Sequence, residues 1–187
     1  MPTWKTRGLR GSAFESLINS TNEYYRKNEL ALVQKIPTPI TPLKFDGERK
    51  LITEAYFEKD STVDYIGVVQ EIPVCFDAKE CKTDTFSMQN IHEHQYRFME
   101  DFEKQGGIAF VLVHFTERND MYYLRFRELK KYYERIKDGH PKNFKYIELE
   151  DDYFLKPNGP AIVNYLEGLN TDLSDRKKEE GWNVWFL

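Results

Sequence analysis

The sequence predicts an α/β fold in which a mixed β-sheet is flanked by helices. Three observations support this prediction. Segments with the 3.6-residue period of helices alternate with short extended segments, and residues 108–115 form a continuous apolar run typical of a buried central strand. The chain has 187 residues and is 40% hydrophobic, which is enough for one core. We therefore expect a single domain over residues 1–187.

The first part of the chain is predicted to contain a helix, a strand and a protrusion. Ser12 and Glu15 have the spacing of a capping box, and apolar residues follow at helical spacing, so a helix is expected over residues 12–28. A short strand is expected over residues 30–35. Several prolines follow, and proline favours extended chain that lacks ladder hydrogen bonds. We expect residues 36–53 to form a stalk-like insertion that protrudes from the main body.

The centre of the chain predicts an antiparallel hairpin. Residues 63–69 and 72–81 read as extended segments, and Gln70-Glu71 forms the expected turn between them. The later elements are expected in the order helix, strand, strand, helix, strand and helix, over residues 89–105, 108–115, 121–126, 128–137, 146–150 and 161–169. The polar tail over residues 172–187 is expected to be loose.

Composition argues against a membrane or secreted protein. No apolar run approaches the roughly 20 residues of a membrane helix, and the N-terminus lacks the apolar segment of a secretory signal. Because Cys75 and Cys81 do not form a C-x-x-C pair, we expect a reduced, cytoplasmic protein with no membrane partner. The net charge of −4 argues against nucleic-acid binding, although Lys5, Arg7 and Arg10 form a basic cluster.

Three charged residues of the predicted hairpin indicate chemistry. Asp77 and Lys79 are two residues apart on one strand and project from the same face, and pairing would bring Asp64 beside them. Adjacent carboxylates repel each other unless a cation intervenes, and Mg²⁺ prefers carboxylate oxygens. Such a site suits metal-dependent hydrolysis of a phosphodiester. The alternative is that Asp77 and Lys79 form only a charge pair on the sheet surface.

Short motifs extend this signal, in order, over nearly the whole chain. They are Thr21-Asn22-Glu23-Tyr24-Tyr25, Pro37-Thr38-Pro39, Glu54-Ala55-Tyr56-Phe57, Asp64-Tyr65-x-Gly67, Phe76-Asp77-Ala78-Lys79-Glu80, Gln89-Asn90-x-His92-x-His94-Gln95 and Glu148-Leu149-Glu150. Together they resemble the RecU family of Holliday junction resolvases, which are nucleases of the PD-(D/E)xK superfold. The resemblance implies a restriction-endonuclease-like core with a protruding stalk, and a nuclease that resolves Holliday junctions during recombination and repair.

The resemblance also implies roles for individual residues. Asp64 and Asp77 match metal-binding acids that take Mg²⁺, for which Mn²⁺ would substitute, and Lys79 matches the catalytic lysine. Glu15 matches a further acidic residue of the site, and Gln95 matches a polar residue that borders it. The alternative for Glu15 is the capping box alone, and the alternative for Gln95 is a solvated helix face.

DNA contacts are implied at two places. Arg10 matches a basic turn that touches a phosphate before the first helix. Lys44, Arg49 and Lys50 lie in the expected stalk, which would occupy the open centre of a four-way junction, and a plain solvated loop is the alternative. The family also implies a homodimer, because a two-fold dimer matches the two-fold symmetry of the junction. Recombinase and branch-migration proteins are implied as further partners.

Three departures from the family pattern leave alternatives open, and one of them is a short N-terminal arm together with an acidic overall charge. The family usually has Glu where this chain has Asp77, which shortens the reach of the carboxylate by one methylene, and a hydroxyl residue where this chain has Val63. One alternative is a nuclease of the same superfold that acts on other branched or duplex DNA. The other is a catalytically weak protein that binds branched DNA without cutting it.

Overall fold

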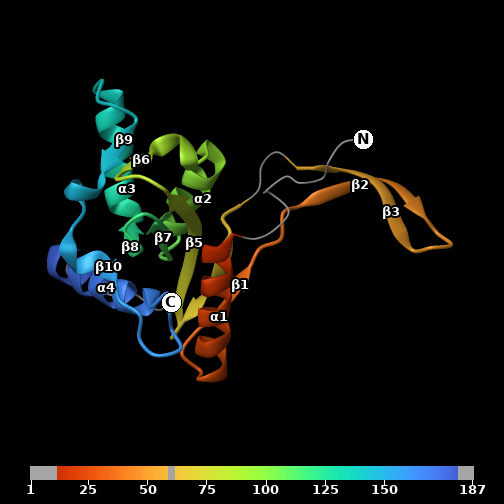
Figure 1. The fold of residues 1–187 in the computed structure, drawn as a ribbon, viewed down its shortest axis with the longest axis horizontal. Helices are drawn as coiled ribbons and strands as arrows, with labels where there is room; N and C mark the ends of the chain where they lie inside the picture. The colour runs from red at the N-terminus through yellow and green to blue at the C-terminus, as the bar shows by residue number, and fades with distance from the viewer. Residues whose placement is uncertain (1–11, 59–61, 181–187) are drawn as a thin grey trace.

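The fold is a mixed β-sheet with helices on both faces, as the sequence predicted (Figure 1). The structure is a computed structural model that describes residues 12–58 and 62–180. Six strands form the main sheet in the order β1 (Leu32–Lys35), β4 (Tyr65–Val69), β5 (Ile72–Cys81), β7 (Ile108–Phe115), β8 (Asp120–Arg125) and β10 (Phe154–Leu155). The main helices are α1 (Ala13–Lys27), α2 (Glu93–Lys104), α3 (Phe126–Lys137) and α4 (Tyr165–Glu180).

The centre of the sheet is the parallel pair β5–β7, and the other neighbouring strands are antiparallel. The crossover between β5 and β7 contains α2, as a parallel connection requires. Phe76 on β5 stacks between Tyr65 and Phe110, with ring centroids 4.8 and 4.7 Å away, and contacts Tyr165 of α4 at 5.2 Å. Since side chains alternate along a strand, Asp77 projects to the opposite face. The aromatic core therefore anchors one face of β5 and leaves the other face for charged residues.

Helix α1 begins where the capping box predicted. The Ser12 hydroxyl accepts a hydrogen bond from the Glu15 N–H, and the Glu15 carboxylate accepts one from the Ser12 N–H. The predicted strand over residues 108–115 is also confirmed, because β7 has these bounds and is almost wholly buried. A periodic apolar pattern and a side-chain cap are both local signals, which explains why these elements were predictable.

A two-stranded hairpin stands away from the main body where the stalk-like insertion 36–53 was expected (Figure 1). It consists of β2 (Ile40–Asp46) and β3 (Leu51–Phe57), so it reaches further along the chain than the expected insertion. The two strands are joined by a ladder of backbone hydrogen bonds, which the prolines of this segment had led us not to expect. Pro42 is accommodated because the pairing between β2 and β3 is irregular beside it.

The strand expected over residues 146–150 is wrong. A short strand, β9 (Asn143–Lys145), comes earlier and pairs with β6 (Thr85–Ser87). The 3-10 turn η3 (Tyr146–Glu148) occupies most of the expected span, and a second 3-10 turn, η4 (Asp151–Tyr153), follows it. The Glu148 carboxylate accepts a hydrogen bond from the Lys145 N–H and pairs with Arg135 of α3. This local cap and the tertiary ion pair favour a turn over an extended chain. A further 3-10 turn, η2 (Met88–Asn90), precedes α2.

The last helix was predicted too early and too short. Residues 161–164 lie outside α4, and α4 continues to Glu180, so the loose tail expected from residue 172 is wrong over residues 172–180. The remainder of that expected tail, residues 181–187, lies outside the described residues. Asp172 is fully buried and Arg176 nearly so. Arg176 donates to Asp172 at 3.1 Å and to the two carboxylate oxygens of Glu103 on α2 at 2.6 and 3.0 Å.

Removing the Arg176 guanidinium is expected to destabilise the fold. The change Arg176→Met would leave the buried Asp172 and the partly buried Glu103 with fewer partners, and breaking a buried ion pair costs about 3–5 kcal/mol. We expect the free energy of unfolding, measured by urea denaturation, to fall by roughly 3 kcal/mol. Lys177→Met is the matched control, because Lys177 is its exposed neighbour on the same helix. Equal stability of the two variants would contradict a structural role for this part of α4.

No helix within the described ranges combines the length and the apolar character needed to cross a lipid bilayer.

Candidate active site

The β4–β5 hairpin brings the predicted acidic residues together. Gln70 and Glu71 both have positive φ, 45° and 73°, which is the backbone of a tight two-residue hairpin turn. The turn fixes the strand register, in which Tyr65 is opposite Phe76. Asp64 precedes Tyr65, and its N–H donates to the Asp77 Oδ1 at 3.0 Å. The expected antiparallel hairpin is therefore confirmed.

A second hydrogen bond completes a reciprocal arrangement of the two carboxylates. The Ala78 N–H donates to the Asp64 Oδ2 at 3.1 Å. Each carboxylate is thus held by a backbone N–H of the opposite segment, so Asp64 and Asp77 owe their positions to the main chain of the hairpin. Backbone support of this kind fixes a site more firmly than flexible side chains can.

Lys79 lies on the same face of β5 as Asp77. Its Nζ is 2.7 Å from the Asp77 Oδ2, and the Lys79 side chain is only 18% exposed. The Nζ also lies 3.4 Å from the Gln95 Oε1 and donates a hydrogen bond to it. The same Gln95 oxygen accepts the His92 N–H at 3.1 Å, which places Gln95 at the N-terminal end of α2. Gln95 is buried, so the structure favours a packed site residue over the alternative of a solvated helix face.

The environment of the two carboxylates disfavours a double negative charge. Burial, and then the charge of Asp77, raise the pKa of Asp64 to about 6. Asp77 is fully buried, and its Oδ2 forms an ion pair with the Lys79 ammonium but accepts no hydrogen bond among the described residues. A buried carboxylate oxygen without a hydrogen bond is costly unless a cation offsets its charge.

This donor set fits a divalent cation. Asp64 and Asp77 offer carboxylate oxygens side by side, and the ion pair with Lys79 is the contact made by the Asp77 Oδ2 among the described residues. No group of three or more His, Cys, Asp or Glu ligands converges within residues 12–58 and 62–180. A site with two protein carboxylates suits Mg²⁺ because that ion usually keeps several waters and binds substrate phosphate in its other positions.

A comparison with models of protein families shows which family this chain belongs to. The model named RecU, described as recombination protein U, matches residues 9–171. This chain belongs to the RecU family. The resemblance seen in the short motifs is therefore confirmed, and the match includes the β4–β5 hairpin, α2 and most of the chain.

Individual RecU proteins are similar over most of their length. The protein named Holliday junction resolvase RecU from Lactococcus lactis is 41% identical over 178 residues, which are 90% of this chain and 83% of the relative. Its namesake from Leuconostoc mesenteroides is 42% identical over 154 residues, or 80% and 74% of the two chains. A solved structure of Archaeoglobus fulgidus Hjc, titled as a Holliday junction resolvase, covers 62% of this chain and 75% of its own with 9% identity. The structural similarity is low, with a TM-score of 0.38.

In this RecU chain, the environment of Glu15 differs from that of the hairpin carboxylates Asp64 and Asp77. Its carboxylate takes part in the capping box and forms an ion pair with Lys35 of β1 at 2.6 Å. The structure shows no hydrogen bond or ion pair between Glu15 and Asp64 or Lys79 in the described part of the chain. The capping role is therefore visible, and a role of Glu15 in chemistry stays a prediction.

Lys35 is a neighbour of the site that the sequence did not single out. It is the last residue of β1, and the next residue, Ile36, donates its N–H to the Asp64 carbonyl at 2.8 Å. The pair Lys35–Glu15 therefore borders Asp64 on the side of α1. A lysine at the end of a short strand carries no sequence signal for this contact, because the contact depends on how β1 pairs with β4.

The residues expected to contact DNA are exposed or lie outside the described chain. Arg10 belongs to residues 1–11, which the structure does not describe. Lys44 pairs with Glu54 across the hairpin at 2.5 Å, Arg49 lies 3.9 Å from Asp46, and Lys50 has a positive φ at the tip. Three basic and three acidic residues occur between residues 40 and 57, so the hairpin has no net charge of its own. DNA contact by these residues stays a prediction.

Proposed function

We propose that this chain is a Holliday junction resolvase, an endonuclease that cuts four-way junction DNA during recombination and repair. The observation that carries the proposal is the cluster of Asp64, Asp77 and Lys79 on one hairpin of a RecU-family chain. Relatives that share about 40% of their residues with it are named Holliday junction resolvase RecU. A resolvase acts on chromosomal DNA, so we place its action in the cytoplasm, at the nucleoid.

Asp64 and Asp77 are the residues proposed to hold Mg²⁺, with Mn²⁺ as a substitute. When bound, this cation would supply Lewis-acid chemistry at the scissile phosphodiester and favour deprotonation of the attacking water. The backbone N–H groups of Asp64 and Ala78 keep the two carboxylates in place. The buried position of Asp77 excludes bulk water from one side of the site, which strengthens each electrostatic interaction there.

Lys79 is proposed to act on the substrate from beside the carboxylates. Its ammonium is tethered by Asp77 and Gln95, yet the side chain keeps some exposure, so it can donate a proton or a hydrogen bond to the reacting phosphate. Positive charge there would offset the charge that develops on the phosphate during attack. Gln95 limits the positions that the flexible lysine side chain can adopt.

The exposed hairpin supports a two-fold assembly on the junction. Its large side chains are about half exposed or more, and they are Ile40, Leu43, Phe45, Leu51, Ile52, Tyr56 and Phe57. Contiguous exposed apolar surface of this kind marks an interaction site. We propose that two copies form a homodimer with two active sites, and that the hairpins enter the open centre of the junction. Recombinase and branch-migration proteins are proposed as partners of the assembled enzyme.

Cleavage of a labelled four-way junction tests the proposal. The junction and a matched linear duplex would be incubated with Mg²⁺ or with a chelator, using the wild type and Lys79→Ala. We expect symmetric nicks on the junction alone, dependent on Mg²⁺ and lost in the variant. Equal cutting of the duplex would instead indicate a general nuclease, and junction binding without nicks would indicate a DNA-binding protein that does not cut.

The pH dependence of stability offers a separate check on Asp64. Because the folded protein raises the pKa of Asp64 from 3.8 to about 6, the folded state binds the proton more tightly than the unfolded state. The contribution of this group to stability is therefore present at low pH and lost as pH rises through about 6. In the presence of a chelator, we expect the free energy of unfolding of Asp64→Asn to rise relative to that of the wild type as the pH is raised from 4.5 to 7.5. The expected change in this difference is on the order of 2 kcal/mol. The measurement is urea unfolding across that range.

Adding Mg²⁺ at pH 7.5 should make the wild type more stable than Asp64→Asn, which reverses the order of stability expected in chelator. A ligand that binds only the folded state stabilises it, and the wild type keeps both carboxylates while Asp64→Asn has lost one. A constant difference between the two proteins at all pH values, with or without Mg²⁺, would contradict this account of Asp64.

A further inference from the structure

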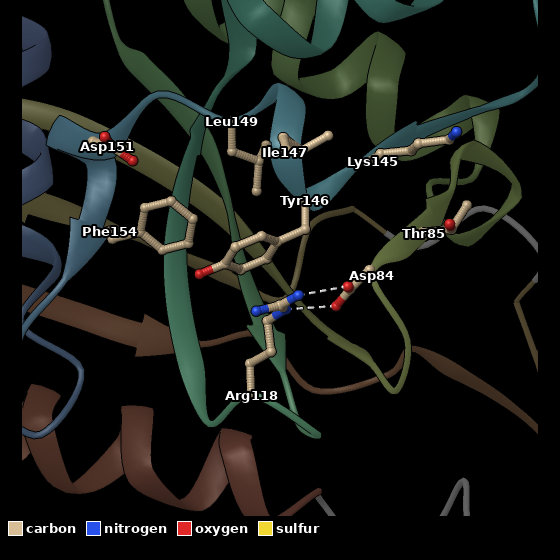
Figure 2. Close-up of a pocket in the computed structure, with 9 residues that line it drawn as sticks. All are labelled: Asp84, Thr85, Arg118, Lys145, Tyr146, Ile147, Leu149, Asp151 and Phe154. Atoms are coloured by element: carbon tan, nitrogen blue, oxygen red, sulfur yellow. Dashed lines mark hydrogen bonds and ion pairs between the residues drawn. The ribbon is translucent and has the colours of Figure 1, made fainter.

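A pocket of about 510 Å³ lies away from the hairpin carboxylates, between the β5–β6 connection, the β7–β8 turn and the segment from β9 to β10 (Figure 2). Asp84 and Thr85 line one side, Arg118 lies below, and Tyr146, Ile147 and Phe154 line the rest together with neighbouring residues of the same segment. Its volume is in the range of pockets that take small ligands or single large side chains, about 300–1,000 Å³.

The floor of the pocket is held rigidly. Two nitrogens of the Arg118 guanidinium donate to the two carboxylate oxygens of Asp84, each at 2.6 Å. The guanidinium carbon lies 4.3 Å from the centroid of the Tyr146 ring, and the Tyr146 hydroxyl donates to Asp120 at 2.7 Å. Side chains fixed in this way lose little freedom when a ligand binds, so the pocket is prepared for an occupant.

The wall of the pocket exposes apolar surface. Ile147 is 88% exposed, the largest exposed fraction among the large hydrophobic side chains that the structure describes. Phe154 lies beside Tyr146, with ring centroids 5.0 Å apart, and Leu149, which also lines the pocket, is buried. Aromatic rings around a cavity, with an exposed aliphatic residue at its edge, match an occupant that inserts an apolar side chain.

The charges around the pocket bear on whether its occupant is a nucleic acid or a basic segment of a protein. Arg118 is neutralised by Asp84, and Glu150 pairs with Arg125. Lys145 lines one end of the pocket and Asp151 the opposite end (Figure 2). Lys145, Asp151 and the exposed neighbour Asp152, which lies outside the lining, form no ion pair within the described ranges, so the Asp151 end carries two carboxylates against one ammonium at the other end. Unpaired carboxylates repel the phosphates of a nucleic acid and attract a basic side chain.

The pocket is separated from the elements that are proposed to contact DNA. It lies beside the β7–β8 turn and β10, the strand at one edge of the main sheet. Strand β1 forms the other edge, and the β2–β3 hairpin extends from that side (Figure 1). An occupant of the pocket would therefore leave the hairpin free. Some of the acidic residues of this chain gather here, where they do not oppose DNA binding at the other edge.

We propose that this pocket docks a protein partner through a segment that carries an apolar anchor next to basic residues. The anchor, of the size of Leu or Phe, would lie against Tyr146, Ile147 and Phe154, and the basic residues would pair with Asp151 and Asp152. This inference goes beyond junction cleavage and does not depend on it, because the pocket shares no residue with the hairpin cluster.

The test is fluorescence-polarisation binding of a labelled peptide, Gly-Lys-Arg-Gly-Leu-Phe-Gly, to the full chain. Two control peptides replace Lys-Arg by Glu-Glu, or Leu-Phe by Gly-Ser. We expect the first peptide to bind with a Kd below 1 mM, on the order of 100 μM, and each control at least about tenfold more weakly. The double variant Asp151→Lys/Asp152→Lys should weaken the first peptide about tenfold, and Ile147→Ser about fivefold.

Glu134→Lys is the matched control variant, because Glu134 is an exposed acidic residue on α3 that does not line the pocket. It should bind the peptide as the wild type does, and all variants should keep the wild-type circular dichroism spectrum, since the substituted residues are exposed. Equal binding of the three peptides, no binding at 1 mM, or equal effects of Asp151→Lys/Asp152→Lys and Glu134→Lys would overturn the proposal. Displacement of the peptide by a short oligothymidine would overturn it in favour of a nucleic-acid site.

Discussion

Replacing Asp77 by asparagine is expected to abolish cleavage of four-way junction DNA. The change keeps the size of the side chain and removes the charge that a cation requires beside Asp64. Loss of several kcal/mol of metal-assisted catalysis corresponds to a rate about 10³-fold lower. The measurement is single-turnover cleavage of a labelled junction in saturating Mg²⁺, with junction binding followed in parallel, and binding should persist.

Two further variants make this prediction specific. Asp77→Glu restores the charge and has the residue usual in the RecU pattern, so it should retain cleavage within about tenfold of the wild type. Glu80→Gln removes an exposed carboxylate three residues along the same strand and should leave the rate unchanged. If Asp77→Asn and Glu80→Gln cleaved equally well, the hairpin cluster would not be the active site.

Removing the protruding hairpin is expected to cost the protein its preference for junctions. Ile40 pairs with Phe57 at the base of the hairpin, so replacing residues 41–56 by Asn-Gly joins these two residues with a tight turn. The replaced side chains are mostly exposed and pack against one another, so the main body should keep its stability. We expect junction affinity to fall about 100-fold, equivalent to about 3 kcal/mol, while duplex affinity changes little.

The measurement is a competition between labelled junction and unlabelled duplex at fixed salt concentration, because phosphate contacts depend strongly on salt. Lys44→Gln/Arg49→Gln, a double change within an intact hairpin, separates charge from shape. A small effect of this double change beside a large effect of the deletion would match the balanced charge of the hairpin. Unchanged junction preference after the deletion would contradict a role of the hairpin in junction recognition.

The predictable part of the fold is the part that local signals specify. The capping box of Ser12 and Glu15 placed the start of α1, the apolar run identified β7, and the Gln70-Glu71 turn placed the β4–β5 hairpin. The spacing of Asp77 and Lys79 predicted their common face because strand geometry alternates side chains, and the structure shows them 2.7 Å apart. Motif order along the chain was enough to identify the RecU family.

Errors occurred where distant contacts outweigh local preference. The polar segment from residue 172 lacks a helical apolar stripe, yet Asp172 and Arg176 are buried. Arg176 pairs both with Asp172 on its own helix and with Glu103 on another helix. The segment 146–150 had the composition of a strand, but the pairing of Glu148 with Arg135 favours a turn there. In both places a charged side chain finds a partner far away in sequence, and a single sequence does not reveal that partner.

The amino-acid sequence by itself determined the α/β class, the family, and the residues of the acidic hairpin, because each depends on patterns that can be read along the chain. These are the alternation of helical and extended segments, the order of the motifs, and the spacing of the charged residues. The tertiary structure decided which residues meet from separate segments. It brought Gln95 of α2 to Lys79, paired Lys35 with Glu15, and assembled the pocket around Tyr146. These contacts arise from the packing of helices on a sheet and from strand pairing over long separations, which local periodicity does not encode.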